Sequence, residues 1–168
     1  MYYDEENRRH ILNMRSIFAE AAGNLADKGR MEDAQRLIDR VEKGISPDNL
    51  PYALASRYNS HNQTGLLYLE ACYKAGKKDL AEKIRLSIRK DLEDQKKYYE
   101  YIKATRPSLY NGFERTEAPI NEIMLEVLSA IESKYAPQVK PNPTIETPGT
   151  IPNGPVRPDS GNTKDTNH

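Results

Sequence analysis

The sequence predicts an all-α domain of two tetratricopeptide-like antiparallel helical hairpins and a fifth, capping helix, followed by a disordered tail. Gly29 and Gly76 each interrupt a run of apolar residues spaced three and four apart, and glycine is the usual left-handed stop between two helices. Each glycine is followed five residues later by an alanine, Ala34 or Ala81, so the same offset separates the two copies. The chain therefore contains one helix–glycine–helix unit twice.

The composition limits the classes of function. The 168 residues fit one domain, and 25 Lys plus Arg balance 25 Asp plus Glu, which disfavours nucleic-acid binding. No run approaches the roughly 18 apolar residues of a membrane span, and the first residues lack the apolar core of a signal peptide. The single cysteine, Cys72, is expected to be buried, and His10, His61 and His168 are too far apart to suggest a metal site. We therefore expect no metal and no cofactor.

The first hairpin is expected to comprise helices over residues 4–27 and 31–43. Asp4 lies where negative charge meets the positive end of the first helix dipole. Small residues in this helix would let a neighbouring helix approach closely. The second helix would bury Ala34 and Ile38 and end at Gly44. The predicted core stripe of the first helix is Ile11, Met14, Phe18, Ala21, Ala22 and Leu25.

A polar insertion separates the hairpins. Pro47 and Pro51 prevent a helix from passing straight through the segment 45–52, and a polar cluster then runs to Thr64. The second hairpin would comprise helices over about 62–74 and from Lys78 to Ile102, the longest element. Its charged later part carries Tyr98, Tyr99 and Tyr101, which point in different directions, so at least one should face outward.

The last predicted helix spans about 117–135 and should close the open end of the bundle. A loop over 106–112 precedes it, Thr116 is its expected cap, and Pro119 fits its first turn. Its predicted core stripe is Ile120, Ile123, Met124, Val127, Leu128, Ile131 and Tyr135. Residues 136–168 are rich in proline and poor in large apolar residues, which predicts a disordered tail. The domain is thus expected to cover residues 1–135.

The sequence resembles two groups of known proteins. The glycine-turn hairpins resemble the tetratricopeptide repeat, although their offset exceeds its roughly 34 residues because of the insertion at 51–63. A closer resemblance covers residues 10–102 and concerns the C-terminal region of large bacterial multi-pass membrane proteins that are similar to protein O-mannosyltransferases. It rests on an ordered set that includes Asn13-Met-Arg15, Pro51-Tyr52, Ser56-Arg57, His61-Asn62, Ala71-Cys-Tyr73, Lys90-Asp-Leu92 and Tyr98-Tyr99.

This resemblance implies a non-catalytic protein-interaction or scaffold module at the soluble end of a membrane glycosyltransferase-like protein, on the periplasmic side. Any glycosyl-transfer chemistry would then belong to a membrane half that this sequence does not contain, so the expected partner is a protein or peptide, including that membrane-embedded half. On the repeat alignment, the ligand-facing positions are Ala19, Gly23, Asp27, Leu66, Glu70 and Tyr73.

The best candidate binding residues lie in and near the polar insertion. Arg15 and Arg57 are suited to a phosphate or carboxylate, and Tyr52 and His61 to stacking on a sugar or aromatic group. The alternative is that these side chains satisfy the backbone of a long inter-helix segment. The full candidate set is Asn13, Arg15, Tyr52, Arg57, Asn59, His61, Asn62, Tyr73, Tyr98 and Tyr99.

Two other functions stay open. A free-standing tetratricopeptide-like adaptor of unknown compartment would have the same fold and would use Tyr98, Tyr99 and Tyr101 as peptide anchors. A small enzyme would need Glu70 with His61, or the group Asp91, Glu93 and Asp94, to exchange protons with a substrate. The sequence does not bring Glu70 and His61 together, so we expect no enzyme activity.

Overall fold

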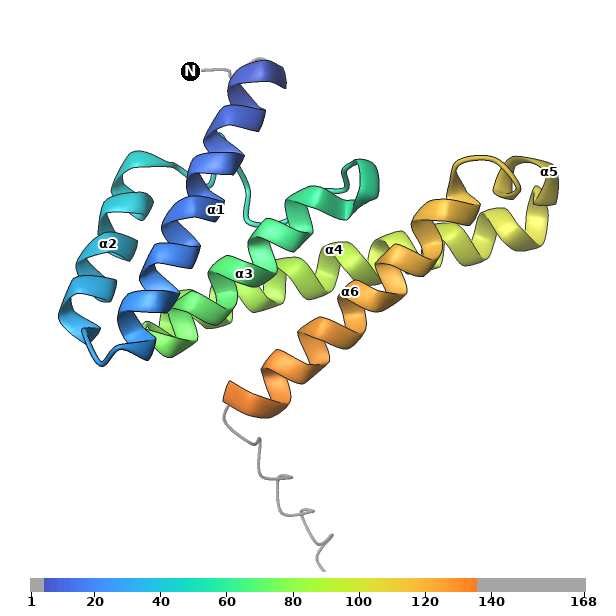
Figure 1. Cartoon of the computed structure of the whole chain (residues 1–168). Coiled ribbons are helices and arrows are strands. Elements are labelled where there is room, and N and C mark those ends of the chain that lie inside the picture. Colours follow the sequence, from blue (N-terminus) through green and yellow to red (C-terminus); the bar gives the residue numbers. More distant parts are fainter. Residues whose placement is uncertain (1–4, 136–168) are drawn as a thin grey trace, which may run out of the picture. The chain divides into compact units, whose positions relative to one another are not determined.

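The computed structural model describes residues 5–135, which lie within one compact unit (Figure 1). This part of the chain is all helical and contains no strand, which confirms the predicted all-α class. The start of the first helix at Asp4 and the predicted tail at 136–168 lie outside the described residues. The elements are α1 (Glu5–Asp27), α2 (Met31–Gly44), the 3-10 helix η1 (Arg57–Asn59), α3 (Ser60–Lys74), α4 (Lys78–Thr105), α5 (Pro107–Tyr110) and α6 (Glu114–Tyr135).

The two glycine turns form as predicted. Gly29 and Gly76 have φ angles of 74° and 75°, a left-handed conformation that side chains disfavour. At the first turn, the Arg30 amide donates to the Leu25 carbonyl at 2.9 Å and the Gly29 amide donates to Ala26 at 2.9 Å. The turn at Gly76 repeats both bonds. This pairing satisfies the last carbonyls of a helix and ends it locally, which explains why both hairpins were visible in the sequence.

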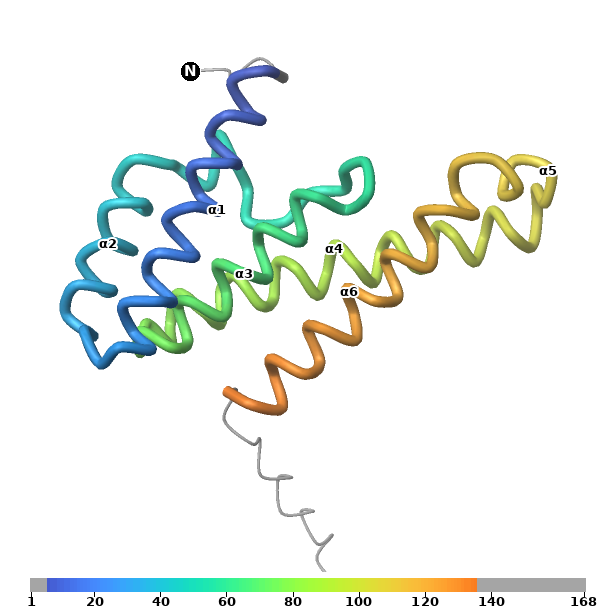
Figure 2. The backbone as a smooth tube through the Cα atoms, viewed as in Figure 1, coloured from blue at the N-terminus to red at the C-terminus, as the bar shows by residue number. Residues whose placement is uncertain are grey.

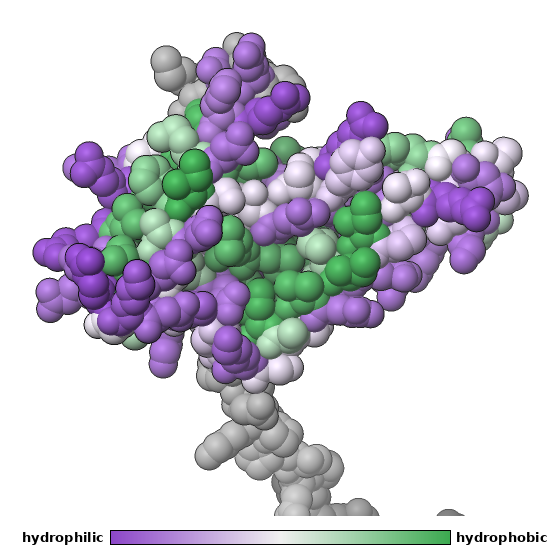
Figure 3. Space-filling model, in the orientation of Figure 1, coloured by the Kyte–Doolittle hydropathy of each residue, from purple (hydrophilic) through white to green (hydrophobic). Residues whose placement is uncertain are grey.

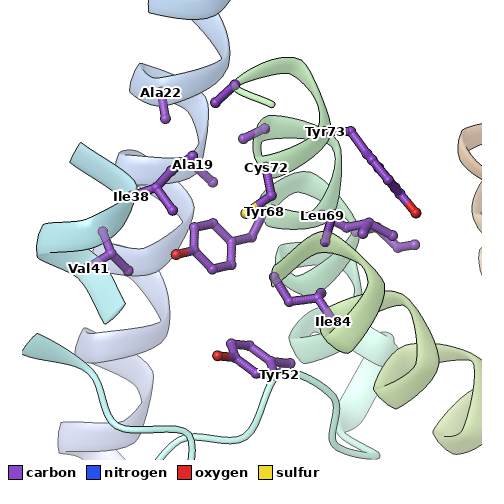
Figure 4. Packing of buried hydrophobic residues seen from close by; sticks show 14 of the residues in the cluster. Ala19, Ala22, Ile38, Val41, Tyr52, Tyr68, Leu69, Cys72, Tyr73 and Ile84 are labelled. Carbon is purple, nitrogen blue, oxygen red and sulfur yellow. The ribbon is translucent and has the colours of Figure 1, made fainter. Parts of the chain in front are cut away.

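The core lies where α1 packs against both α2 and α3 (Figure 4). Ala19 and Ala22 are fully buried and let α1 approach α3 closely. Tyr68, Leu69 and Cys72 of α3 are also fully buried, which confirms the expected burial of the single thiol. The other fully buried apolar residues are Ala34 and Ile38 of α2 with Ala81, Ile84, Ile88 and Leu92 of α4, and Leu128 of α6.

The predicted stripe of α1 was right at Ala22 and wrong at Met14, while Ile11, Phe18 and Leu25 are partly buried against the core. The buried line consists of Arg15, Ala19, Ala22 and Ala26, whereas Met14 is half exposed. Because α1 contacts two helices at once, its line of closest approach needs small side chains, and the larger residues that the pattern favoured lie beside it.

The segment between α2 and α3 forms one hydrogen-bonded turn, in which the Leu50 amide donates to the Ser46 carbonyl at 3.0 Å, and contains no helix until η1 (Figure 2). It passes so close to α3 that a Cβ atom on Gly65 would lie 2.7 Å from the Tyr52 carbonyl oxygen. Gly65 is therefore required for this contact. The segment places Leu50 and Tyr52 in the core, where they are 1% and 4% exposed.

Helix α6 covers the second hairpin by packing against α3 and α4, as expected of a cap. Leu128 and Ile131 are buried, and the Tyr135 ring stacks on Tyr73 with centroids 5.5 Å apart. The predicted stripe was wrong at Ile123 and Val127, which are 52% and 39% exposed. No further described helix covers this side of α6.

The ends of α6 also differ from the prediction. The helix begins at Glu114, so Thr116 lies inside it and does not cap it. The expected loop at 106–112 contains α5, which Pro107 starts at its first position, where the missing N–H costs nothing. None of the described helices is long and apolar enough to cross a membrane.

Candidate functional site

Two of the candidate residues converge on one backbone group. Arg15, 1% exposed, donates to the Pro51 carbonyl at 2.9 Å and to the Leu50 carbonyl at 2.8 Å. The His61 Nε2 lies 2.7 Å from the same Pro51 oxygen and must donate to it, because a carbonyl only accepts. Burial lowers the pKa of His61 and favours its neutral form. These side chains thus satisfy the carbonyls of the insertion.

Tyr52 is held by a carboxylate that sequence reasoning missed. Its hydroxyl donates to Glu42 at 2.5 Å, and the Tyr68 hydroxyl donates to the other oxygen of Glu42 at 2.9 Å. Burial is the main cause that raises the pKa of both tyrosines, and Glu42 adds to it. The Arg15 guanidinium lies 5.4 Å from the Tyr52 ring centroid. The ring is therefore committed to the core and is not open for stacking on a ligand.

Asn59 and Asn62 belong to a second buried network. Asn62 donates to Asn59 at 2.7 Å and to Asp91 at 2.7 Å, and its own oxygen accepts from the Leu54 amide at 3.2 Å. Asn59 donates to Asn121 of α6 at 3.3 Å. This network ties the insertion to α4 and α6. Gln95 joins it through bonds to Asn59 and Asp91.

The network holds an unusual backbone turn at the start of α3. Tyr58 and Asn59 have φ angles of 54° and 51°, which non-glycine residues rarely adopt. The Tyr58 amide donates at 2.9 Å to Glu117, a carboxylate that is 1% exposed. Because partners on α4 and α6 hold both residues, the turn is fixed. Arg57 beside it is exposed and donates to the Tyr58 hydroxyl at 3.2 Å.

Beside this turn lies a basic cleft of about 490 Å³. Its charged walls are Arg8 and Arg9 of α1 and Arg57 of the insertion, and none of the described carboxylates lines it. The hydroxyl residues Ser56 and Ser60 also line it. Two sequence candidates therefore line this cleft, the exposed Arg57 and the buried His61, and Arg8 and Arg9 are neighbours that sequence reasoning missed.

A second surface feature is the face that α1, α3 and α6 present together, with α4 running behind α3 and α6 (Figure 1). A groove of about 90 Å³ between α1 and α3 is lined by Ala19, Gly23, Asp27 and Glu70, as expected from the repeat alignment. Leu66, 4% exposed, does not line it, and Leu67 takes its place. We use the name α1–α3–α6 face for this groove together with the neighbouring exposed side of α6, which carries Ile123 and Val127.

The tyrosine candidates have separate surroundings. Tyr73 is 8% exposed and packs under α6, where its hydroxyl donates to Glu82. Tyr98 is exposed, which confirms the expectation of an outward-facing tyrosine, and its hydroxyl donates to Glu114 at 3.2 Å. Tyr99 is half-buried, and burial raises its pKa to about 12. Asn13 is exposed on α1, and Tyr101 is also exposed.

The groups considered for proton transfer do not face one another. Glu70 accepts from Tyr135 at 3.2 Å and lies 3.4 Å from Lys134, whereas His61 is bound to the Pro51 carbonyl. Asp91 belongs to the buried amide network. Glu93 pairs with Arg89, and Asp94 pairs with Lys90 and Lys97. Among residues 5–135, no group of acids, histidines and cysteines is arranged to hold a metal ion.

Comparison of the chain with protein-family models, with curated proteins and with solved structures gave no match. The described residues form an all-α protein of two glycine-turn hairpins capped by a further long helix, with a basic cleft and one partly apolar face.

Proposed function

We propose that this chain is a protein-interaction module that binds a partner protein segment on the α1–α3–α6 face. The observation that carries the proposal is the set of large apolar side chains exposed on these three helices. Leu67, Ile123 and Val127 are 38%, 52% and 39% exposed, and Ile17 is 64% exposed. Figure 3 shows an apolar area over α3 and α6 on this side of the molecule.

Helix geometry concentrates the apolar residues of α6. Ile123 and Val127 are four residues apart and lie on one side of the helix. Ile131 continues this line by four residues and is buried, so the exposed pair lies at the edge of the buried stripe of α6. Single exposed apolar residues are ordinary on a protein surface, but a pair on one line of α6, together with Leu67 on α3, is typical of an interaction site.

The charges near this face are largely paired. Lys74 of α3 binds Asp27 of α1 at 2.8 Å, and Lys134 of α6 lies 3.4 Å from Glu70 of α3. These pairs link neighbouring helices at one end of the face and leave little net charge there. The face is therefore suited to an apolar, uncharged partner segment more than to a charged tail.

We also propose the membrane context that the sequence resemblance implies. The module would be the soluble, periplasmic end of a membrane glycosyltransferase-like protein, and the ordered residues between 10 and 102 support this. The alternative is a free-standing adaptor with the same binding face. An antibody against residues 5–135 separates the two: a membrane band far above 19.2 kDa supports the appendage, whereas a soluble band near that mass supports the adaptor.

The face is tested by paired variants in the source cells. Tagged chains are cross-linked in vivo, and the captured proteins are quantified by mass spectrometry. The double variant Ile123→Ser/Val127→Ser should lose one specific partner. Leu86→Ser is the matched control, because Leu86 of α4 is 57% exposed but lies outside this face. If the unchanged chain, the double variant and the control captured the same partner in equal amounts, the face would not be the binding surface.

A further inference from the structure

We propose that the basic cleft between the start of α1 and the insertion binds a small organic phosphate. The cleft is distinct from the α1–α3–α6 face, and none of its lining residues belongs to that face. Its volume of about 490 Å³ falls within the range of small-molecule sites. The proposal thus concerns a second ligand class for the protein.

The first argument is the unbalanced charge of the walls. Arg8, Arg9 and Arg57 come from two elements far apart in sequence and line the same cleft. Within residues 6–135, no carboxylate lies in ion-pair distance of any of the three. Other arginines are paired: Arg85 and Arg89, for example, share Glu132. Within this range the three guanidinium groups have no paired carboxylate, and their combined positive charge favours a multiply charged anion.

The second argument is the type of donor. Guanidinium groups form paired hydrogen bonds to phosphate oxygens, and such charge-assisted bonds are stronger than neutral ones. The hydroxyl residues Ser56 and Ser60 stand in the same wall. The Ser56 oxygen accepts from the His61 amide at 2.9 Å and lies 3.4 Å from the Ser60 oxygen, so the two hydroxyls form a linked pair in this wall that can donate to a phosphate oxygen.

The third argument is that part of the lining is apolar. Leu12, Leu50 and Leu54 share the cleft with the arginines. A bare phosphate ion would leave these side chains uncovered, whereas a phosphate that carries an organic group would cover them. The ligand class is therefore an organic phosphate more than the free ion.

The fourth argument is that the wall is rigid before any ligand binds. The left-handed pair Tyr58 and Asn59 is held by Glu117 and Asn121 of α6, and His61 at the base is held by the Pro51 carbonyl. A preformed site loses less conformational freedom on binding. The buried candidates Asn59 and His61 thus have an indirect role: they hold the wall that carries Arg57 and the two serines.

The test is calorimetric titration of the full chain with phenyl phosphate and, separately, with inorganic phosphate at matched ionic strength. Phenyl phosphate should bind about tenfold more tightly, because it also covers the apolar wall. The double variant Arg9→Ala/Arg57→Ala should weaken phenyl phosphate by about tenfold or more. Both side chains are exposed, so the variant should fold normally.

Arg115→Ala is the control, because Arg115 is exposed on α6 and does not line the cleft. It should leave the affinity unchanged. Equal losses in the control and the double variant would show nonspecific charge attraction and overturn the proposal. Equal affinity for the two probes would overturn the organic part and identify free phosphate as the ligand. Absence of binding to both probes would overturn it entirely, without bearing on the protein-binding face.

Discussion

The same substitution is predicted to have opposite effects at two helical glycines. Gly65 lies in α3 beneath the insertion, and an added Cβ would meet the Tyr52 carbonyl oxygen at 2.7 Å and an Ile88 methyl at 3.1 Å. Gly23 lies in α1, where the nearest atom to an added Cβ is a methyl of Ala71 at 4.0 Å. Alanine is favoured over glycine in a helix by about 1 kcal/mol. Only steric contact distinguishes the two sites.

At Gly65 the contact should outweigh the helix gain. The Tyr52 backbone cannot retreat easily, because Arg15 and His61 hold the preceding carbonyl at 2.9 and 2.7 Å. Overpacking in a core costs about 1–3 kcal/mol. We therefore expect Gly65→Ala to lower the free energy of unfolding by about 1–2 kcal/mol, the contact cost less part of the helix gain.

At Gly23 the helix gain should remain. The contact with Ala71 is at ordinary van der Waals distance, so Gly23→Ala should raise the free energy of unfolding by about 0.5–1 kcal/mol. Urea unfolding followed by far-ultraviolet circular dichroism measures both values. The reasoning is refuted if Gly65→Ala stabilises the protein, since the insertion would then not press on α3 as the structure shows.

Three further predictions concern buried or paired groups. Burial lowers the pKa of His61, so below about pH 6.5 the unfolded chain binds more protons than the folded chain. The free energy of unfolding should therefore fall as the pH falls through this range. The variant His61→Gln should make the free energy of unfolding depend less on pH. Glu132 is the shared acceptor of two α4 arginines, so Glu132→Gln should cost about 1–2 kcal/mol, measured by urea unfolding. Burial raises the pKa of the Cys72 thiol, so iodoacetamide should react slowly with the native chain and fast in urea.

Each of these predictions has its own contrary result. His10→Gln serves as the histidine control, because His10 is exposed, and an equal flattening by both variants would contradict the role of His61. A Glu132→Gln chain as stable as wild type would show that its arginines find other acceptors. Alkylation of native Cys72 at the rate of the unfolded thiol would contradict its complete burial.

The fold was predictable because its determinants are local. Gly29 and Gly76 end their helices through bonds to residues only three to five positions away, and apolar spacing indicated the long helices. The rotation of α1 was not predictable, because it depends on contact with two helices at once. The small residues, Ala19 among them, were expected to allow a close approach, but the apolar spacing favoured Met14 for the core.

The surroundings of the candidate site depend on contacts between residues far apart in sequence. Asn59 is held by Gln95 and Asn121, which lie 36 and 62 residues away. One signal was present: Asn121 falls in line with the buried Leu128 and Ile131 of α6, and a polar residue in an apolar stripe indicates a buried hydrogen bond. The left-handed turn at Tyr58 had no sequence signal at all.

The central claim is that the α1–α3–α6 face binds a protein partner, and site-specific photo-crosslinking tests it most directly. A photoreactive amino acid is placed at Val127 on the face and, in a second chain, at Leu86 outside it. The account predicts that position 127 forms a crosslink to one defined partner segment in the source cells and that position 86 does not. Crosslinks from position 86 alone, or from neither position, would contradict it.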